Sequence, residues 1–517
     1  MTATNENAAV YFVDRHAGSD HRHKAAFVDS GTGEALSYAE LARESGRLAD
    51  LYERHGIRRE ERVAMLVFDC LAFPVIFWGS LKAGVVPIPL NTLLSSDIYA
   101  AILKDSRARA AFVSAELLPV VAPVLAECPC LDKVFVVGDA PADSRLLSFH
   151  EELAAAKVRE TLDVGADECA FWLYSSGSTG QPKGVRHVHA SLKQTADTYG
   201  AQVLGIEHGD VVYSVAKLFF AYGLGNAMTF PMSVGATTVL LSGRPTPDSV
   251  CGVLERYRPT VFCGVPTLYA ATLQHVASGK GRIEAPLRRC ISAGEALPEN
   301  VGKRWRELTG CDILDGVGST EMLHIFVSNR PGDVVYGTSG IAVPGYEVRL
   351  VDENDVDLGP GQVGELVVKG ASSASDYWNQ REKSRSTFVG DWTRTGDKYE
   401  MTEGGRLVYC GRTDDMFKVS GIWVSPFEIE QALVAHPSVL EAAVVAARDE
   451  EGLEKPKAYV VLKQGATGDA LSEELKDIVK ERIGKWKYPR WVEIVPDLPK
   501  TATGKIQRFK LRDGTHD

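Results

Sequence analysis

Several features that the sequence lacks limit the classes of protein to which it can belong, before any motif is considered. Residues 1–7 contain neither a basic cluster nor an apolar run, so we expect no leader segment and a cytoplasmic location. The most apolar window, residues 71–90, contains Pro74 and Lys82 and changes from a helical to a strand pattern. That mixture favours burial in protein over insertion into a bilayer, so we expect no membrane partner.

Positive charge and patterned cysteine are also scarce. The chain has 57 Lys and Arg residues against 68 Asp and Glu residues, and its net charge of −11 argues against general nucleic-acid binding. Its nine cysteines, an odd number, show no metal-ligand or redox spacing, which is typical of small core residues. There is no internal repeat, and 517 residues are too many for one core. We expect two to four domains of about 150 residues each.

One stretch, residues 174–184, is rich in groups that bind phosphate. It follows an apolar run and contains hydroxyls, glycines and one lysine: Ser175, Ser176, Gly177, Ser178, Thr179, Gly180, Lys183 and Gly184. Glycines let backbone N–H groups face an anion without steric cost, hydroxyls add donors, and lysine supplies the opposite charge. The stretch is not a Walker loop, because no Ser or Thr follows its lysine. A flexible surface loop would explain the glycines but not the strand-like run before them.

The remaining pattern alternates between strands and helices. We expect strands at residues 62–68, 85–90, 110–113, 210–215, 236–241, 261–265, 289–293 and 312–315, with helix-length segments between them. This alternation predicts an α/β fold of layered parallel β/α subdomains. We predict a large N-terminal domain at 1–413, with a β-rich subdomain at about 325–412, and a small mobile α+β C-terminal domain at 414–517.

The sequence also predicts where two helices start and where functional loops lie. Capping patterns at Ser37 and Ser425 mark the starts of two helices. Ligands of open α/β sheets collect at the carboxyl ends of the strands. We therefore expect functional loops at residues 219–223, 294–298 and 316–324.

Five motifs stand in order along the chain. They are the phosphate-binding stretch, Gly316-Val-Gly-Ser-Thr-Glu321, Thr393-Arg-Thr-Gly-Asp397, Gly411-Arg-Thr-Asp-Asp415 and Pro499-Lys-Thr-Ala-Thr-Gly-Lys505. Together they resemble the acyl-adenylate-forming superfamily, which includes acyl-CoA synthetases, peptide-synthetase adenylation domains and beetle luciferases. The resemblance implies that a carboxylate reacts with ATP to give an acyl adenylate and pyrophosphate, and that the thiol of coenzyme A then displaces AMP. It implies ATP, Mg²⁺ and coenzyme A as cofactors or co-substrates.

The resemblance also implies roles for residues of these motifs. Glu321 would ligate Mg²⁺, Thr320 would bind the α-phosphate, and Lys505 would bridge carboxylate and phosphate, so that its loss should slow adenylation about 10²–10³-fold. The phosphate-binding stretch would hold ATP together with a second set of residues: Gly294, Glu295, Ala296, Leu297, Asp315 and Gly316 around adenine, and Asp397 and Arg412 at the ribose.

Each of these residues has a simpler interpretation when it is taken alone. Glu321 could satisfy backbone donors at a helix start, Asp397 and Arg412 could form a surface ion pair, and Lys505 could be solvated. Only the joint order of the motifs favours the functional interpretation.

The fourth motif resembles the hinge of the superfamily, with Asp414 in the hinge position. Rotation of the small domain between half-reactions would bring the following loop to the site, where it would bind coenzyme A: Lys418, Ser420, Gly421, Ile422 and Trp423. Gly421 would line the pantetheine tunnel, where a side chain would obstruct the thiol. A plain β-turn is the alternative.

The loops around the acyl group resemble those of benzoate–CoA ligases, in the aryl-CoA ligase branch. Residues 219–223 contain no aspartate to pair with an ammonium group, which disfavours amino-acid activation. The resemblance implies a pocket for an aromatic carboxylate formed by Ala221, Tyr222, Val317, Gly318, His324 and Ile325. Benzoate, 4-hydroxybenzoate and other carboxylates stay open as substrates. A non-catalytic nucleotide-binding sensor is the rival from another class.

Two further hypotheses concern partners. Acetylation of Lys505 by a lysine acetyltransferase would remove its charge and so block adenylation while sparing thioester formation. The sequence does not show the oligomeric state, and a homodimer stays open because it is the commonest soluble assembly.

Overall fold

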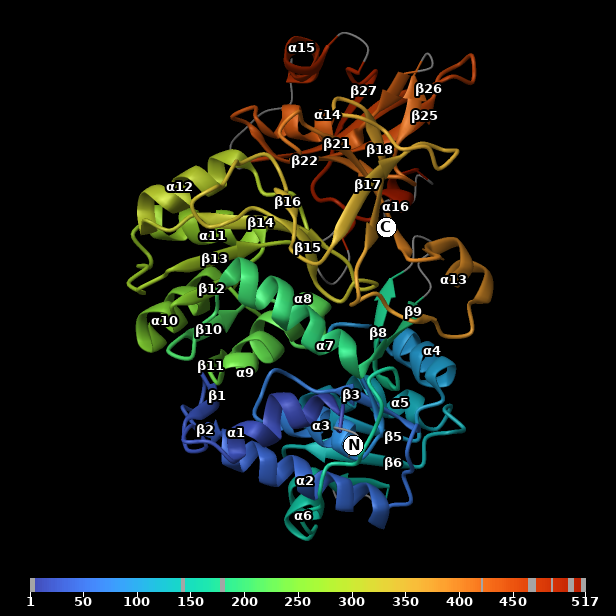
Figure 1. Cartoon of the computed structure of the whole chain (residues 1–517). Coiled ribbons are helices and arrows are strands. Elements are labelled where there is room, and N and C mark those ends of the chain that lie inside the picture. Colours follow the sequence, from blue (N-terminus) through green and yellow to red (C-terminus); the bar gives the residue numbers. More distant parts are fainter. Residues whose placement is uncertain are drawn as a thin grey trace. The chain divides into compact units, whose positions relative to one another are not determined.

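The structure is a computed structural model that describes residues 5–140, 145–176, 182–419, 422–463, 471–484, 487–500 and 506–512 (Figure 1). The chain forms two compact units. The first consists of Met1–Val348 and Val367–Arg394, and the second of Arg349–Leu366 and Thr395–Asp517. The predicted domain boundary at residue 414 stays a prediction.

The larger sheet of the first unit has nine strands in the order β16-β15-β14-β13-β12-β10-β11-β1-β2. Its strands are β1 (Ala25–Asp29), β2 (Ala35–Ser37), β10 (Val211–Ser214), β11 (Thr237–Leu240), β12 (Val261–Gly264), β13 (Arg289–Ser292), β14 (Ile313–Gly318), β15 (Ile325–Ser328) and β16 (Ile341–Ala342). The six strands from β1 to β14 in this order pair in parallel, and an antiparallel strand or pair closes each end.

Three helices pack on this sheet through their apolar faces. They are α10 (Pro247–Tyr257), α11 (Pro266–Ala277) and α12 (Glu299–Thr309). Leu254, Tyr269 and Trp305, one from each helix, lie in one buried cluster with Phe262 of β12 and Ile313 of β14. The parallel strands and the buried helix faces together form a β/α layer, as the alternating pattern predicts.

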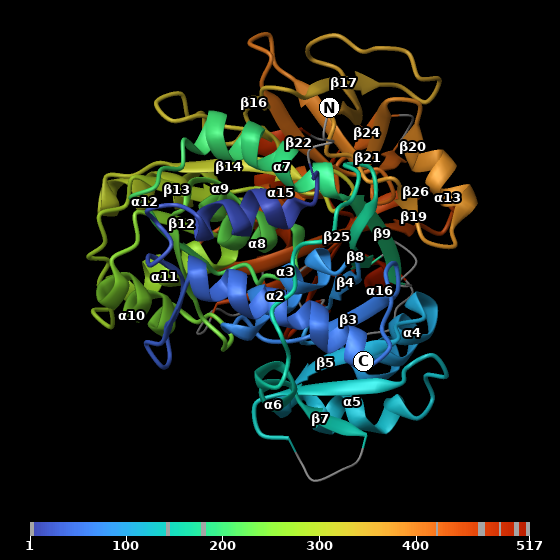
Figure 2. The ribbon, with the colours of Figure 1, turned by 60° about the horizontal axis from the view of Figure 1, so that its bottom comes forward.

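A second, fully parallel sheet has the order β4-β3-β5-β6-β7. Its strands are β3 (Arg62–Leu66), β4 (Val86–Pro89), β5 (Ala110–Ser114), β6 (Lys133–Val137) and β7 (Leu146–Ser148). Helices α4 (Ser96–Ser106) and α5 (Leu118–Leu125) lie beside this sheet in both views (Figures 1 and 2). Their buried side chains, such as Leu103 and Val121, share a core with β3 and β5.

A small third sheet has the order β19-β9-β8. Strands β8 (Cys169–Ser176) and β9 (Pro182–Val188) are antiparallel, and β19 (Asp376–Tyr377) pairs with the other edge of β9. The remaining described helices of this unit are η1 (Val10–Asp14), α1 (Arg15–Ala17), α2 (Tyr38–Arg54), α3 (Ala72–Lys82), η2 (Ala115–Leu117), α6 (Phe149–Ala154), α7 (His189–Thr195), η3 (Ala196–Leu204), α8 (Ala221–Leu224), η4 (Gly225–Thr229), α9 (Phe230–Val234) and α13 (Arg381–Thr387).

The second unit contains a small α+β fold. Strands β25 (Val439–Arg448) and β26 (Glu454–Leu462) are antiparallel, and β27 (Trp491–Ile494) is parallel to β26. Helices α14 (Pro426–Val434) and α15 (Leu471–Ile483) pack on them through side chains such as Ile429 and Leu475. The last described helix is α16 (Arg508–Arg512), and β23 (Phe417–Val419) and β24 (Ile422–Val424) form a hairpin. The other strands of the segment 347–412 are β17 (Glu347–Val351), β18 (Val363–Lys369), β20 (Phe388–Val389), β21 (Trp392–Met401) and β22 (Leu407–Arg412).

Both predicted helix caps are present. The Ser37 hydroxyl accepts a hydrogen bond from the backbone N–H of Glu40, and the Glu40 carboxylate accepts one from the backbone N–H of Ser37. The Ser425 hydroxyl caps α14 by accepting a hydrogen bond from the backbone N–H of Glu428. No described helix is long and apolar enough to cross a membrane.

Three details differ from the sequence-based expectation. Strand β14 extends through Gly318, because its last residues pair with β15, so the loop begins only at Ser319. Helix α8 begins at Ala221, inside the segment expected to be a loop. Lys183 lies in β9, opposite Ser175, and is therefore held by a strand pair.

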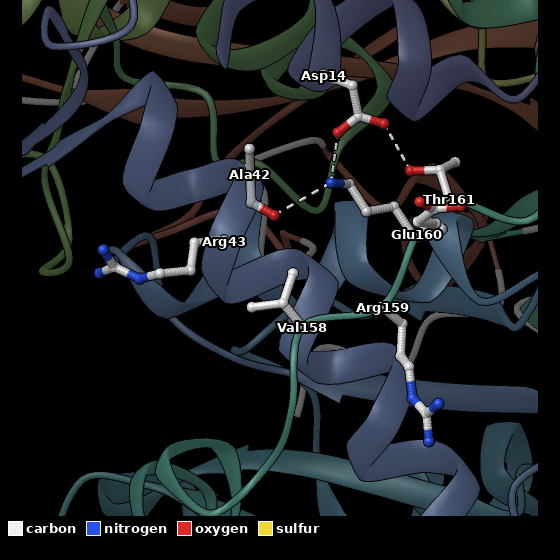
Figure 3. Close-up of a pocket in the computed structure, with 8 residues that line it drawn as sticks. Asp14, Ala42, Arg43, Val158, Arg159, Glu160 and Thr161 are labelled. Atoms are coloured by element: carbon white, nitrogen blue, oxygen red, sulfur yellow. Dashed lines mark hydrogen bonds and ion pairs between the residues drawn. The ribbon is translucent and has the colours of Figure 1, made fainter. Parts of the chain in front are cut away.

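A buried ion pair fastens the start of the first unit to its helices. Lys82, at the end of α3, has only 4% of its side chain exposed, and its ammonium donates to the carboxylate of Asp14 at 2.5 Å and to the carbonyl of Ala42 at 3.1 Å. The hydroxyl of Thr161 donates to the other oxygen of Asp14 at 2.5 Å, as Figure 3 shows. These groups border a cavity of about 400 Å³. The contacts tie η1, α2, α3 and the segment leading to β8 together.

We predict that Asp14→Ala lowers the free energy of unfolding by about 3 kcal/mol, because it leaves the buried Lys82 ammonium without its carboxylate. Denaturant-induced unfolding followed by tryptophan fluorescence measures the change. Asp197→Ala removes an exposed partner of Lys193 and is the control, with an expected loss below about 0.5 kcal/mol. Equally small losses in both variants would contradict the prediction.

Candidate functional site

The predicted phosphate-binding stretch connects two paired strands. Ser175 is opposite Lys183 and Ser176 is opposite Pro182, so the hairpin holds both ends of the stretch in register. The Ser175 hydroxyl is buried and has no hydrogen-bond partner among the residues that the structure describes. A buried donor without a partner is costly, and a bound anion would satisfy it. Residues 177–181, with Gly177, Ser178, Thr179 and Gly180, lie outside the described residues, as does the side chain of Ser176.

Lys183, Glu321 and Tyr377 form a compact cluster. The Lys183 ammonium lies 2.9 Å from the Glu321 carboxylate and donates to the Tyr377 hydroxyl at 2.9 Å. The Tyr377 hydroxyl donates to the same Glu321 oxygen at 2.7 Å, and its ring lies 4.2 Å from the ammonium. Only 13% of the Lys183 side chain and 14% of the Glu321 side chain are exposed. The cluster therefore holds one cation and one anion ready in a largely buried position.

The charge state of Glu321 follows from these contacts. Burial alone would raise the pKa of Glu321, but the Lys183 ammonium and the Tyr377 hydroxyl lower it below its ordinary value. The carboxyl group is therefore ionised. A single carboxylate fits Mg²⁺, because this ion usually binds proteins through one or two carboxylates and completes its shell with phosphates and water. Among the described residues, no group of three or more His, Cys, Asp or Glu side chains could hold a metal ion.

Backbone contacts fix the segment that carries Thr320 and Glu321. His187 of β9 is buried, and its Nε2–H donates to the carbonyl of Thr320 at 2.9 Å. The carbonyl of Glu321 accepts from the N–H of Ala374 at 2.7 Å. Burial lowers the pKa of His187 to about 4, so the ring is neutral at neutral pH. The hairpin thus positions the Thr-Glu segment directly.

The third strand of the small sheet is held to β9 by a second ion pair. Arg186 and Asp376 are paired across the strands, and the guanidinium donates to both carboxylate oxygens at 2.5 Å. This bidentate geometry fixes the orientation of both groups. It places the neighbouring Tyr377 beside Lys183.

The predicted adenine-binding residues lie in the turn that follows β13 and within β14. Asp315 is buried, its Oδ1 has no hydrogen-bond partner among the described residues, and burial raises the pKa of its carboxyl well above the ordinary value. Burial is the main cause of this rise in pKa, and the nearby backbone of Leu297 and Gly316 opposes it. Gly294 has a φ of +95°, a conformation that suits glycine at this turn. Glu295 and Ala296 are half-buried in the same turn.

The predicted acyl pocket contains a buried histidine among aromatic rings. The Nε2–H of His324 donates to the carbonyl of Tyr222 at 3.3 Å, and its Nδ1 has no hydrogen-bond partner among the described residues. Phe230, Tyr199 and Tyr222 have ring centroids 4.5, 5.2 and 5.7 Å from that of His324. Burial lowers the pKa of His324 to about 3.

The backbone around His324 is tightly packed. A Cβ on Gly225 would lie 2.3 Å from the His324 ring, and one on Gly318 would lie 2.5 Å from the His324 carbonyl oxygen. Val317 is half-buried in β14, Ile325 is buried at the start of β15, and Ala221 is half-buried at the start of α8. The predicted pocket residues therefore belong to three neighbouring elements of the first unit.

The second unit contains the predicted ribose-binding pair. Asp397 of β21 is opposite Arg412 of β22, and the guanidinium donates to the carboxylate at 2.9 Å. Asp414 is exposed in the turn that follows. Lys418, Ile422 and Trp423 lie in the β23–β24 hairpin, and the structure describes only their backbone; Ser420, Gly421 and Lys505 lie outside the described residues.

Four residues of the site were not predicted from the motifs: Arg186, His187, Asp376 and Tyr377. Tyr377 is 56 positions from Glu321, and no spacing within a single motif connects the two. The signal available in the sequence was weak, a short aromatic run at residues 377–378 after an acidic residue.

Comparison with known proteins shows the family to which the chain belongs. The profile of the AMP-binding enzyme family matches residues 13–378, and that of the AMP-binding enzyme C-terminal domain matches residues 428–505. The chain belongs to the AMP-binding enzymes, the acyl-adenylate-forming superfamily that its five motifs predict. The predicted α/β fold, with a large N-terminal and a small C-terminal domain, is confirmed with it.

Within that family, the chain is similar to aryl–CoA ligases over its full length. It is 51% identical to 4-hydroxybenzoate–CoA/benzoate–CoA ligase of Rhodopseudomonas palustris, covering 100% of this chain and 95% of the relative. It is 52% identical to benzoate–CoA ligase of Thauera aromatica, covering 98% and 95%. The crystal structure of a benzoate CoA ligase from Burkholderia xenovorans LB400 is 48% identical, with a TM-score of 0.90 over 98% of this chain and 99% of the other.

Buried neutral histidines predict how stability depends on pH. The pKa values of His187 and His324, about 4 and about 3, lie below the ordinary value of 6.5, so between these limits the unfolded chain binds more protons than the folded one. The contribution of these two neutral histidines to stability is therefore fully present above about pH 6.5. It is lost as the pH falls from 6.5 to their pKa values in the folded protein.

We predict that His187→Phe reduces the loss of unfolding free energy between pH 7.5 and pH 5 by up to about 2 kcal/mol, since one titrating group is removed. Phenylalanine keeps a ring beside Phe171, although it leaves the Thr320 carbonyl unpaired at every pH. Denaturant unfolding at the two pH values measures the difference. His150→Phe, at an exposed site, should keep the wild-type pH dependence. A pH dependence unchanged in His187→Phe would contradict the assignment.

Proposed function

We propose that the chain joins benzoate, or a close aromatic analogue, to coenzyme A with consumption of ATP and release of AMP and pyrophosphate. The class, an AMP-forming acid–thiol ligase, is confirmed by relatives about 50% identical over nearly the whole chain. One observation carries the proposal. The Lys183–Glu321–Tyr377 cluster lies beside the predicted phosphate-binding stretch, in a chain that belongs to this class of ligase.

In the first half-reaction, the chain brings two anions together. Lys183 and the Ser175 hydroxyl offer a cation and a donor to the phosphates of ATP, and Thr320 contacts the α-phosphate. Glu321 provides one carboxylate ligand for Mg²⁺, which when bound neutralises phosphate charge. The carboxylate oxygen attacks the α-phosphorus, the bond from this phosphorus to the oxygen of the β-phosphate breaks, and pyrophosphate leaves. Lys505, which lies outside the described residues, bridges the substrate carboxylate and the α-phosphate during this step.

Adenine and ribose bind to separate polar groups. The unpaired Oδ1 of Asp315 is an acceptor for the amino group of adenine, and the turn of Gly294, Glu295, Ala296 and Leu297, with Gly316, surrounds the base. Asp397 and Arg412 hydrogen-bond the ribose hydroxyls. These contacts orient ATP without taking part in bond making.

In the second half-reaction, the small domain turns about Asp414. Lys505 withdraws, and the hairpin with Lys418, Ser420, Gly421, Ile422 and Trp423 contacts the pantetheine arm. The thiol attacks the acyl carbon, the bond from that carbon to the phosphate oxygen breaks, and AMP leaves. Such gating steps commonly separate the two halves of a reaction.

The acyl pocket favours a flat ring. Ala221, Val317 and Gly318 leave space, while Tyr222, His324 and Ile325 provide aromatic and apolar contacts. The unpaired Nδ1 of the neutral His324 can accept a hydrogen bond, which would suit the hydroxyl of 4-hydroxybenzoate. The relative from Rhodopseudomonas palustris is named for both acids, so 4-hydroxybenzoate is the second candidate.

The dependence on Mg²⁺, a cytoplasmic location, a homodimer and acetylation of Lys505 stay predictions. The first is supported by the ionised Glu321 carboxylate. The others rest on the sequence alone. Finding Lys505 unmodified in protein isolated from cells would contradict the acetylation hypothesis.

We predict that, among a panel of aryl and alkyl acids, benzoate and close ring analogues give the highest kcat/KM for AMP formation with ATP, Mg²⁺ and coenzyme A. The pocket should prefer a ring over a short alkyl chain by about 10-fold or more, since each methylene-sized contact contributes about 1–3 kcal/mol. Release of AMP and pyrophosphate measures turnover.

Two outcomes would contradict this function. A preference for alkyl acids would keep the enzyme class and overturn the aromatic substrate. ATP binding without turnover on any acid would instead support the nucleotide sensor. Omission of the acid is the control, because an enzyme should release pyrophosphate only when a substrate acid is present.

A further inference from the structure

The second unit contains an ion-pair network that the reaction described above does not use. It consists of Asp415, Glu430, Arg508 and Arg512, and we call it the carboxylate–arginine network. Arg508 donates to both oxygens of Glu430 at 3.0 and 2.7 Å, and its third nitrogen lies 3.5 Å from Asp415. Arg512 donates to the Asp415 carboxylate and, at 3.3 Å, to the carbonyl of Asp414. One carboxylate of the turn is thus held by two arginines of α16.

The network is anchored in the core of the unit. Glu430 of α14 has 7% of its side chain exposed, and it also accepts from the backbone N–H of Val444 in β25 at 2.8 Å. Asp415 and Arg508 have 16% and 21% of their side chains exposed. Such partly buried, bidentate charge pairs are more rigid than surface pairs, because the guanidinium fork fixes the geometry of both partners.

The segment that carries Lys505 is bounded by fixed residues on both sides. Lys500 and Ile506 form a β-bridge, and the N–H of Gln507 donates to the carbonyl of Pro499 at 2.8 Å. Lys500 also pairs with Glu441 of β25 at 2.6 Å. On the other side, Arg508 is three positions from Lys505, so the network begins directly after the bridge.

These contacts link two parts of the chain that are far apart in sequence. Asp415 follows the proposed hinge residue Asp414, while Arg512 is 97 positions away in α16. Because the same carboxylate holds both arginines, the turn at residues 414–415 and helix α16 are fixed relative to one another.

We propose that Asp415 is a positioning residue for adenylation, which acts through Arg508 and Arg512 to hold the Lys505 segment to the hinge turn. The inference rests on the proposed function, because it concerns the half-reaction in which Lys505 takes part. Asp415 does not contact the reacting atoms. Its carboxylate holds α16, which begins three positions after Lys505, to the hinge turn.

The test separates the two half-reactions in the full-length protein. Asp415→Asn keeps the size of the side chain but loses the charge that attracts both arginines. We expect benzoate-dependent ATP–pyrophosphate exchange to fall about 10–100-fold in kcat with little change in the KM for ATP, since a small misplacement of a catalytic group has this effect. Formation of benzoyl-CoA from supplied benzoyl-AMP should change less than about 2-fold, because it does not need Lys505.

Three further variants sharpen the comparison. Asp415→Glu should recover most of the exchange activity, because Asp415 borders a cavity of about 760 Å³ that has room for one more methylene. Arg508→Lys keeps the charge but cannot span both carboxylates, so it should show the same split as Asp415→Asn. Asp477→Asn removes an exposed partner of Lys480 on α15 and should change neither half-reaction.

The outcomes distinguish this inference from the proposed function. If the wild type forms no benzoyl adenylate, the proposed function fails and the inference falls with it. If the wild type is active but Asp415→Asn loses nothing, or loses both half-reactions equally together with thermal stability, the inference alone is overturned. A loss confined to adenylation, with rescue by Asp415→Glu, supports it.

Discussion

The ion pair between Lys183 and Glu321 is the interaction on which the candidate site depends. It joins β9 to the turn after β14, and Tyr377 of β19 donates to Glu321 and accepts from Lys183. Both side chains are largely buried, so neither charge is tolerable without the other or a replacement. The small three-stranded sheet is therefore coupled by charge to the turn between β14 and β15 of the nine-stranded sheet.

The pair also explains how an anion site can exist before its ligand binds. Lys183 has an anion to neutralise it, and Glu321 has a cation and a hydroxyl that keep it ionised. In the proposed function, each group exchanges its partner for a phosphate or a metal ion when a nucleotide binds. Preorganised groups of this kind cost little reorganisation at the moment of reaction. In the second unit, the carboxylate–arginine network also uses paired charges, but it fixes helix α16 to the turn at residues 414–415 rather than preparing a ligand site.

The sequence predicted well what depends on local pattern. The caps at Ser37 and Ser425 and the parallel strands follow from hydrogen bonding and periodicity over a few residues. The end of β14 was missed because residues up to Gly318 become a strand only through pairing with β15. Helix α8 begins at Ala221 rather than after a loop, which the surrounding aromatic residues did not indicate.

The candidate site likewise contains residues that the sequence predicts and residues that it does not predict. The motifs predict Lys183 and Glu321 as site residues, because the order of the motifs along the chain is distinctive, and the structure brings these two side chains together. They do not identify the residues that orient those groups. Tyr377 and His187 act through contacts across 56 and 133 positions, and only the three-dimensional pairing of strands brings them to the site.

The most direct test of the central pair is the effect of Mg²⁺ on ATP binding, measured by equilibrium titration of the wild type and of Glu321→Gln. We expect Mg²⁺ to strengthen ATP binding by about 10-fold or more in the wild type, a difference of about 1.4 kcal/mol, and to have no such effect in Glu321→Gln. Glu299→Gln, at an exposed position of α12, should behave like the wild type. An equal effect of Mg²⁺ on the wild type and Glu321→Gln would contradict the role of this carboxylate.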